Sequence, residues 1–191
     1  MAGCMEALLF SFVAAALAGW GERSQLLTAL VSGRSRRPLT VMIGWVLAAL
    51  AICAVAGIGG AVLHGEITAR AQALLVAVAL GFAGVMGLFE PPPPGWAARF
   101  KGGPFLTSLI FGFVFASGGR AQLMTFAFAA RSDAPLLVAA GGAAGMILAA
   151  VPAALLGKEF LDWRLRPVRI GVAALFLLVG GTVALAAIQP G

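Results

Sequence analysis

Long runs of apolar residues, separated by short polar or proline-rich breaks, make up most of the chain. A run of about 20 apolar residues is long enough to cross the hydrocarbon core of a bilayer as a helix. The longest break, residues 90–103, contains Pro91-Pro92-Pro93-Pro94, which cannot continue a helix and favours an extended polyproline stretch. The pattern therefore predicts an all-α integral membrane protein with six transmembrane helices, at residues 5–32, 38–63, 71–89, 104–130, 134–157 and 169–188.

One sequence pattern occurs twice, with its two copies 97 positions apart. Residues 21–28 read GERSQLLT, and residues 118–125 read GGRAQLMT. Matching leucines and alanines are expected by chance between apolar helices, but glycine, arginine, glutamine and proline also fall in the same frame. We interpret this as a duplication. It divides the chain into a first three-helix repeat at residues 1–89, a proline-rich linker at 90–103 and a second three-helix repeat at 104–191.

The number of helices in each repeat predicts how the two repeats are oriented. Three spans are an odd number, so the second repeat enters the membrane with the opposite orientation. Such inverted repeats are found in many secondary transporters, which bind their substrate near the midplane where the repeats meet. Loops one, three and five carry nine lysines and arginines, against two on the other side, Arg70 and Arg131. The positive-inside rule then places these three loops in the cytoplasm and both termini outside it.

Composition supports the same class of protein. The chain is 61% hydrophobic and 10% charged, with a mean hydropathy of +1.02, whereas soluble domains carry about 25% charged residues. The net charge of +6 would ordinarily suggest a nucleic-acid partner. Here the basic residues lie mostly at the ends of the apolar runs, so we expect the bilayer as partner and no nucleic acid. The absence of a Ser/His/Asp set, a metal-ligand cluster and a phosphate-binding loop predicts that the chain is not an enzyme.

The repeated pattern places polar side chains inside apolar segments, where they are energetically unfavourable. A single arginine at the centre of a membrane helix costs about 2.5–3.5 kcal/mol on insertion scales. Two such placements at matching positions indicate a functional site on the ion or substrate pathway. The candidate residues are Glu22, Arg23, Ser24 and Gln25 from the first copy, and Ser117, Arg120 and Gln122 from the second.

The two copies resemble the motif E-x-G-D-(K/R)-(S/T), often followed by Gln, of the small six-helix manganese/calcium–proton antiporters. This family includes the Golgi manganese transporter and bacterial manganese exporters. The first copy here reads GWGERSQ at residues 19–25, and the second reads ASGGRAQ at residues 116–122. The resemblance continues over residues 5–7, 145–153 and 173–177. It implies a multi-pass protein of a bacterial inner (cell) membrane that exchanges manganese or calcium for protons and has no resident cofactor.

The acidic positions of the motif depart from the family pattern. Glu22 replaces the aspartate of the first copy, and Gly119 occupies the equivalent position of the second. The outer glutamate positions are Gly19 and Ala116. Where the family pattern has four carboxylates and two basic residues, this chain has Glu22 and two arginines, so the net charge changes from −2 to +1. The predicted cation site is therefore reduced in carboxylates, with Glu22 as its metal ligand.

Three functions remain open on these residues. In the first, which the resemblance favours, Glu22 is ligand and proton carrier of a divalent-cation/proton antiporter, and neutral oxygens come from Ser24, Gln25, Ser117 and Gln122. In the second, the chain is a non-transporting structural or regulatory membrane protein in which Glu22 pairs with Arg23 or Arg120. In the third, a carrier has changed substrate and the two arginines accept an anion. The inverted repeat further predicts that Arg23 superposes on Arg120 and Gln25 on Gln122. The oligomeric state is left open.

Overall fold

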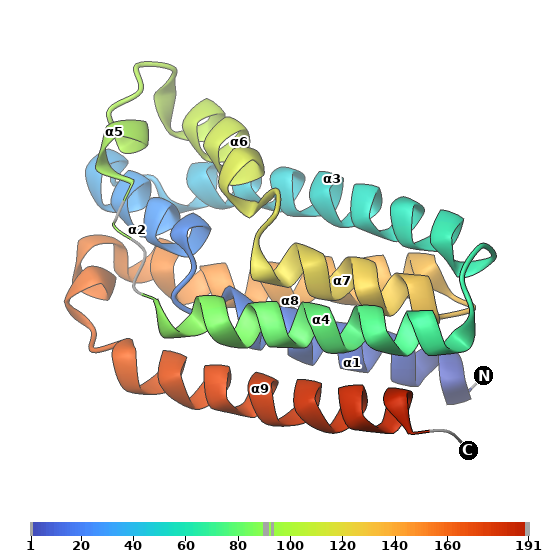
Figure 1. The fold of residues 1–191 in the computed structure, drawn as a ribbon. Coiled ribbons are helices and arrows are strands. Elements are labelled where there is room, and N and C mark those ends of the chain that lie inside the picture. The colour runs from blue at the N-terminus through green and yellow to red at the C-terminus, as the bar shows by residue number, and fades with distance from the viewer. Residues whose placement is uncertain (1, 90–91, 93, 190–191) are drawn as a thin grey trace.

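The computed structural model describes residues 2–89, 92 and 94–189, and within them the chain is helical and contains no strand (Figure 1). This confirms the predicted all-α class. In chain order the helices are α1 Ala2–Gly19, α2 Arg23–Ser35, α3 Pro38–His64, α4 Ala69–Leu88, α5 Gly95–Ala98, α6 Gly103–Ala116, α7 Arg120–Arg131, α8 Pro135–Leu156, the 3-10 helix η1 Gly157–Asp162, and α9 Arg166–Ile188.

The first and fourth predicted spans are each broken in two. Residues 5–32 and 104–130 were expected to form one helix each, and this expectation is wrong. Helices α1 and α2 meet at an angle of 65°, and α6 and α7 meet at 61°. Both breaks contain a glycine in the left-handed region, Gly21 with φ of 72° and Gly118 with φ of 77°. Glycine adopts this conformation without steric penalty, so each break occurs where the sequence permits it. With each bent pair counted as one span, the described chain has six.

The two repeats are inverted with respect to each other. Helices α3 and α8 are equivalent and run in opposite directions, as do α4 and α9 (Figure 1). Each repeat packs its first span against the second span of the other, α1 along α8 and α6 along α3. The Ser11 hydroxyl donates to the Val138 carbonyl at 2.7 Å, and the Ser108 hydroxyl donates to the Val41 carbonyl at 2.8 Å. These two bonds are the same interaction exchanged between repeats, as a two-fold axis in the membrane plane requires.

Small residues let these paired helices approach closely. A Cβ atom added to Gly44 on α3 would lie 2.6 Å from the backbone oxygen of Phe105 on α6. A Cβ added to the equivalent Gly141 on α8 would meet the backbone oxygen of Leu8 on α1. Without a hydrophobic driving force between helices in lipid, such close backbone contact is a main source of helix association.

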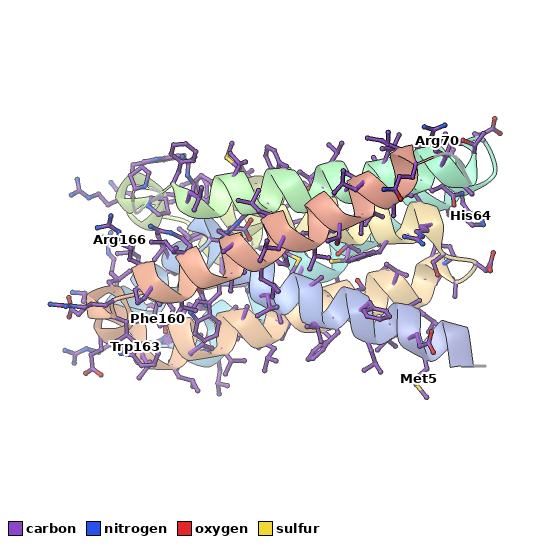
Figure 2. The ribbon with its side chains drawn as sticks, turned by 60° about the horizontal axis from the view of Figure 1, so that its bottom comes forward. Met5, His64, Arg70, Phe160, Trp163 and Arg166 are labelled. Carbon is purple, nitrogen blue, oxygen red and sulfur yellow. The ribbon has the colours of Figure 1, made fainter. Side chains whose placement is uncertain are left out.

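The ends of the bundle separate the termini from the basic loops. Both termini lie at one end of the bundle, and the linker and η1 lie at the other (Figure 1). Met5, His64 and Arg70 are at the first of these ends, whereas Phe160, Trp163 and Arg166 are at the second (Figure 2). One loop assignment was wrong: Arg169 lies inside α9 and is only 5% exposed, so the contrast in basic residues is eight to two.

The linker contains a short helix that packs on the second repeat. The Trp96 ring of α5 contacts Phe111 and Phe115 of α6 edge-on, with centroids 5.4 and 5.9 Å apart. The expected polyproline stretch includes Pro91 and Pro93, which lie outside the described residues. The boundaries of the repeats at 89/90 and 103/104 therefore stay a prediction.

The close contact at Gly44 predicts a strong effect of one methyl group. Gly44→Ala should lower the free energy of unfolding by about 1–3 kcal/mol, because the Phe105 backbone cannot move away without separating α3 from α6. Gly181→Ala on α9 is the matched control, since an added Cβ there meets no atom within 4 Å. The measurement is the melting temperature in detergent. Equal melting temperatures for the two variants would contradict the close α3–α6 packing.

Candidate functional site at the two helix breaks

A glutamine one turn further along the chain stabilises each break. The backbone N–H of Gly21 donates to Oε1 of Gln25 at 2.7 Å, and the N–H of Gly118 donates to Oε1 of Gln122. Gln25 also donates from Nε2 to the carbonyl of Ala149 on α8, at 2.5 Å. Both glutamines were predicted as neutral oxygen ligands. One lone pair of each side-chain oxygen is instead used to satisfy a backbone N–H that the helix no longer bonds.

Glu22 connects the two repeats through its carboxylate. The residue is 8% exposed. Its Oε1 accepts from the backbone N–H of Arg120 at 2.8 Å, and its Oε2 accepts from the hydroxyl of Ser24 at 3.3 Å. Arg120 is the first residue of α7, so a carboxylate of the first repeat caps a helix of the second and lies at its positive end. The predicted tie between Glu22 and Arg120 is made through the backbone N–H.

The glycine at position 119 provides the space that Glu22 occupies. A Cβ atom at Gly119 would lie 2.5 Å from Oε1 of Glu22, too close for any side chain without moving the carboxylate. The Glu22 side chain of the first repeat thus occupies the space beside Gly119 of the second, where a side chain at position 119 would otherwise lie.

The two arginines of the motif occupy different environments despite their equivalent positions. Arg120 is 6% exposed and donates from Nη2 to the carbonyl of Trp20 at 3.1 Å, a second bond between repeats. Arg23 is exposed. Sequence reasoning missed a third arginine, Arg169 of α9, whose Cδ would lie 3.6 Å from a Cβ atom on Gly21. Pro167 in the first turn of α9 was the signal that this helix begins before Arg169, the predicted first residue of the span.

A pocket of about 390 Å³ lies between the two breaks. It brings together four of the predicted residues, Glu22, Arg23, Ser117 and Arg120. Its other walls are Gly21, Phe82, Met86, Phe89, Val114, Phe115, Gly118 and Gly119.

A second, small cavity of about 10 Å³ lies beside Glu22. Ser24 and Gln25 line it, together with Gly19, Glu22, Trp45, Met146, Ala149 and Ala150. Glu22 thus belongs to both spaces. Gln122, the remaining predicted residue, lies at the second break and contributes to neither of these two linings.

The donor set at the breaks is poor in acidic ligands. Among the residues that the structure describes, no group of three or more His, Cys, Asp or Glu side chains could hold a metal ion. A hard cation at the breaks would have the carboxylate of Glu22, the Ser24 hydroxyl and backbone or amide oxygens as its ligands. The site residues named from the sequence therefore stay a prediction, with Glu22 as the acidic ligand.

Comparison with known proteins identifies the family. The sequence profile described as "Divalent cation/proton antiporter GDT1" matches residues 7–93 and matches again at residues 104–190. The chain belongs to the GDT1 family. The two matched segments start 97 positions apart, so the GDT1 unit is the repeat found in the sequence. The recognition made from the motifs is confirmed, and the chain is a multi-pass membrane protein of a cation-transporter family.

One curated relative in the family covers most of the chain. The chain is 34% identical over 178 residues to a "putative manganese exporter" of Vibrio cholerae serotype O1. The aligned segment covers 92% of this chain and 88% of the relative. No solved structure matches the fold. GDT1 is a transporter family, which agrees with the expectation that the chain is not an enzyme.

The contact between Gly119 and Glu22 predicts the effect of a substitution at the second break. Gly119→Ala should displace the Glu22 carboxylate from the Arg120 N–H and lower the free energy of unfolding by about 1–3 kcal/mol. Gly81→Ala on α4 is the control, because its added Cβ has no atom within 4 Å. Thermal unfolding in detergent measures the stability of both variants. In a Glu22→Ala background the penalty at position 119 should become smaller, and the remainder is due to the Ala116 carbonyl oxygen, 2.9 Å from the added Cβ. An unchanged penalty there would show that the carboxylate is not the cause.

Proposed function

We propose that the chain is a divalent-cation/proton antiporter that uses one carboxylate, that of Glu22, as both cation ligand and proton carrier. The observation that carries the proposal is the position of Glu22 on both the open pocket and the small cavity. A carboxylate in this position can pass a bound ion between the open pocket and the small cavity. We propose manganese as the cation, because the Vibrio cholerae relative carries the name of a manganese exporter.

Exchange follows from the physics of a buried carboxylate. Burial of a negative charge is unfavourable, and the N–H of Arg120 and the hydroxyl of Ser24 compensate it only in part. The Glu22 side chain therefore binds either a proton or a cation. Binding of one therefore opposes binding of the other. This competition couples the movement of a cation in one direction to proton movement in the other.

The small cavity supports a position for a dehydrated ion. Its volume of about 10 Å³ is close to the minimum that holds one water-sized particle. The Ser24 hydroxyl and the Glu22 carboxylate line it, and both offer the oxygen ligands that manganese accepts. The pocket of about 390 Å³ on the other side of Glu22 has room for a hydrated ion. An ion would lose its water on passing Glu22.

A second candidate is a non-transporting membrane protein derived from the family. It is favoured by two of the bonds between repeats, from the Arg120 N–H to Glu22 and from the Arg120 guanidinium to the Trp20 carbonyl. In that protein Glu22 acts as a fixed cap of α7.

We further propose that the protein lies in a bacterial inner membrane with both termini extracytoplasmic. The support is the distribution of basic residues. Eight belong to the breaks at the end of the bundle with α5 and η1, whereas Arg70 and Arg131, the last residue of α7, lie at the end with the termini (Figures 1 and 2).

Glu22→Gln separates the two candidate functions. If Glu22 carries protons and cations, the variant should lose manganese-driven proton movement in proteoliposomes. The amide oxygen still accepts from the Arg120 N–H, so the fold should be kept under either function. Removal of the charge beside the buried Arg120 should lower the free energy of unfolding under both, so the proton movement is the measurement that separates them. Glu66→Gln, at an exposed acid in the α3–α4 loop, is the control for both measurements. Wild-type protein without cation-dependent proton flux would remove the antiporter proposal.

The orientation is tested with a pair of cysteines at glycines whose surroundings are open. An added Cβ meets no atom within 4 Å at Gly95 in the linker or at Gly65 after α3. In a Cys4→Ser background, Gly65→Cys should react with a membrane-impermeant thiol reagent in intact cells and Gly95→Cys should not. Cys53 can stay, because it is buried. The reverse labelling pattern would invert the proposed topology.

A further inference from the structure

The pocket at the two breaks carries a charge opposite to the one that a cation requires. Arg23 and Arg120 line it, and among the described residues of its lining Glu22 is the one acid, so these side chains sum to +1. The buried Arg169 of α9 lies close behind Gly21. Two unit charges about 4 Å apart interact by about 4 kcal/mol at an effective dielectric constant of 20, so the excess positive charge opposes entry of a divalent cation.

Backbone dipoles increase this positive field. Helices α2 and α7 begin at Arg23 and Arg120, so two helix N-termini with their positive ends meet at the pocket. Glu22 is the N-cap residue of α2, but its side chain makes no capping bond to α2. Its carboxylate bonds the first N–H of α7 instead. The one acid of the site therefore compensates the N-terminus of α7, and the N-terminus of α2 has the exposed Arg23 beside it.

We propose that this pocket binds a small oxyanion of the carbonate, sulfate or phosphate class between Arg23 and Arg120. The anion also supplies the oxygen ligands that the reduced motif lacks when a divalent cation binds at Glu22. Guanidinium groups bind such oxyanions with paired N–H donors in a plane. A volume of about 390 Å³ holds a small oxyanion, a cation and several waters together.

The proposed anion changes the sign of the net charge around the pocket. With a dianion between the arginines, the charge around the pocket changes from +1 to −1, and a cation is attracted rather than repelled. Gly119 and Ala116, which stand where the family motif has acids, leave the second break with no carboxylate of its own, so that Glu22 of the first repeat is the acid bonded there. The oxyanion replaces the missing oxygens from solution. This ligand role rests on the proposed function, whereas the anion site itself does not.

Anion binding is tested first, without metal. In neutral maltoside micelles, sodium sulfate should raise the melting temperature of the wild-type protein above its value in sodium chloride of equal ionic strength. The expected rise is about 3–6 °C at saturation. Arg23→Gln should lose this rise, and its exposed position lets the variant fold. Arg131→Gln, at the exposed far end of α7, should keep it. No rise in the wild type, or an equal rise in Arg23→Gln, overturns the anion site.

The phosphate of a lipid headgroup offers the same oxyanion chemistry. A second experiment, with added lipids, distinguishes a headgroup from a free anion. Phosphatidylglycerol added to the micelles should stabilise the protein no more than phosphatidylcholine does if the anion comes from solution. A rise seen with phosphatidylglycerol but not with sulfate, and lost in Arg23→Gln, overturns the free oxyanion and assigns the pocket to a headgroup phosphate.

The ligand role is tested by manganese binding, measured from the loss of the free-manganese resonance in electron paramagnetic resonance spectra. Sulfate should tighten binding at least tenfold relative to chloride in the wild type and in Arg131→Gln, and not in Arg23→Gln. Equal affinity in the two salts overturns the ligand role but leaves the proposed function intact. No manganese binding in either salt, with the sulfate stabilisation preserved, overturns the proposed function and supports the anion site alone.

Discussion

Backbone that leaves the helical conformation inside a membrane must find hydrogen-bond partners within the protein, because lipid offers none. This constraint governs the two breaks of this chain. Gln25 and Gln122 satisfy it at equivalent positions by accepting from the N–H groups of Gly21 and Gly118. Once the breaks are stable, two helix N-termini face each other in the interior of the bundle. The pocket, the arginines beside it and the capping carboxylate all depend on that arrangement.

The repeats are equivalent in backbone and unequal in chemistry. Matching glycines, glutamines and bend angles of 65° and 61° show how closely the second repeat follows the first. The charged side chains do not follow this symmetry: one carboxylate serves both halves, and of two equivalent arginines one is buried and one exposed. Because Glu22 occupies the space that Gly119 leaves, the bond to Arg120 depends on both an acceptor oxygen at position 22 and the absence of a side chain at position 119. The symmetric scaffold holds an asymmetric site.

Much of the fold was predictable, since apolar run length gives the spans and the odd number of spans in each repeat gives their inversion. The breaks were not predicted, although Gly21 and Gly118 lay in the motif, because a glycine in an apolar run is equally consistent with close helix packing. The coupling of Glu22 to Gly119 links positions 97 apart, and only the fold brings them together. Arg169 was counted with the charges of loop five because it stood at the predicted start of the last span, whereas α9 begins at Arg166. Of the predicted site residues, four share the pocket, whereas the glutamines hold the backbone.

The exchange of partners between repeats has a consequence for synthesis. Helix α1 packs along α8, and the carbonyl that receives the Ser11 hydroxyl is 127 residues further along the chain. At about 5–20 residues per second, the ribosome takes roughly 6–25 s to make that partner. During this interval the first break and its charged residues are in the membrane without the helices that will cover them. Proteins that assist insertion, or lipids themselves, have to accommodate the half-made chain, and the rate of translation becomes a factor in its yield.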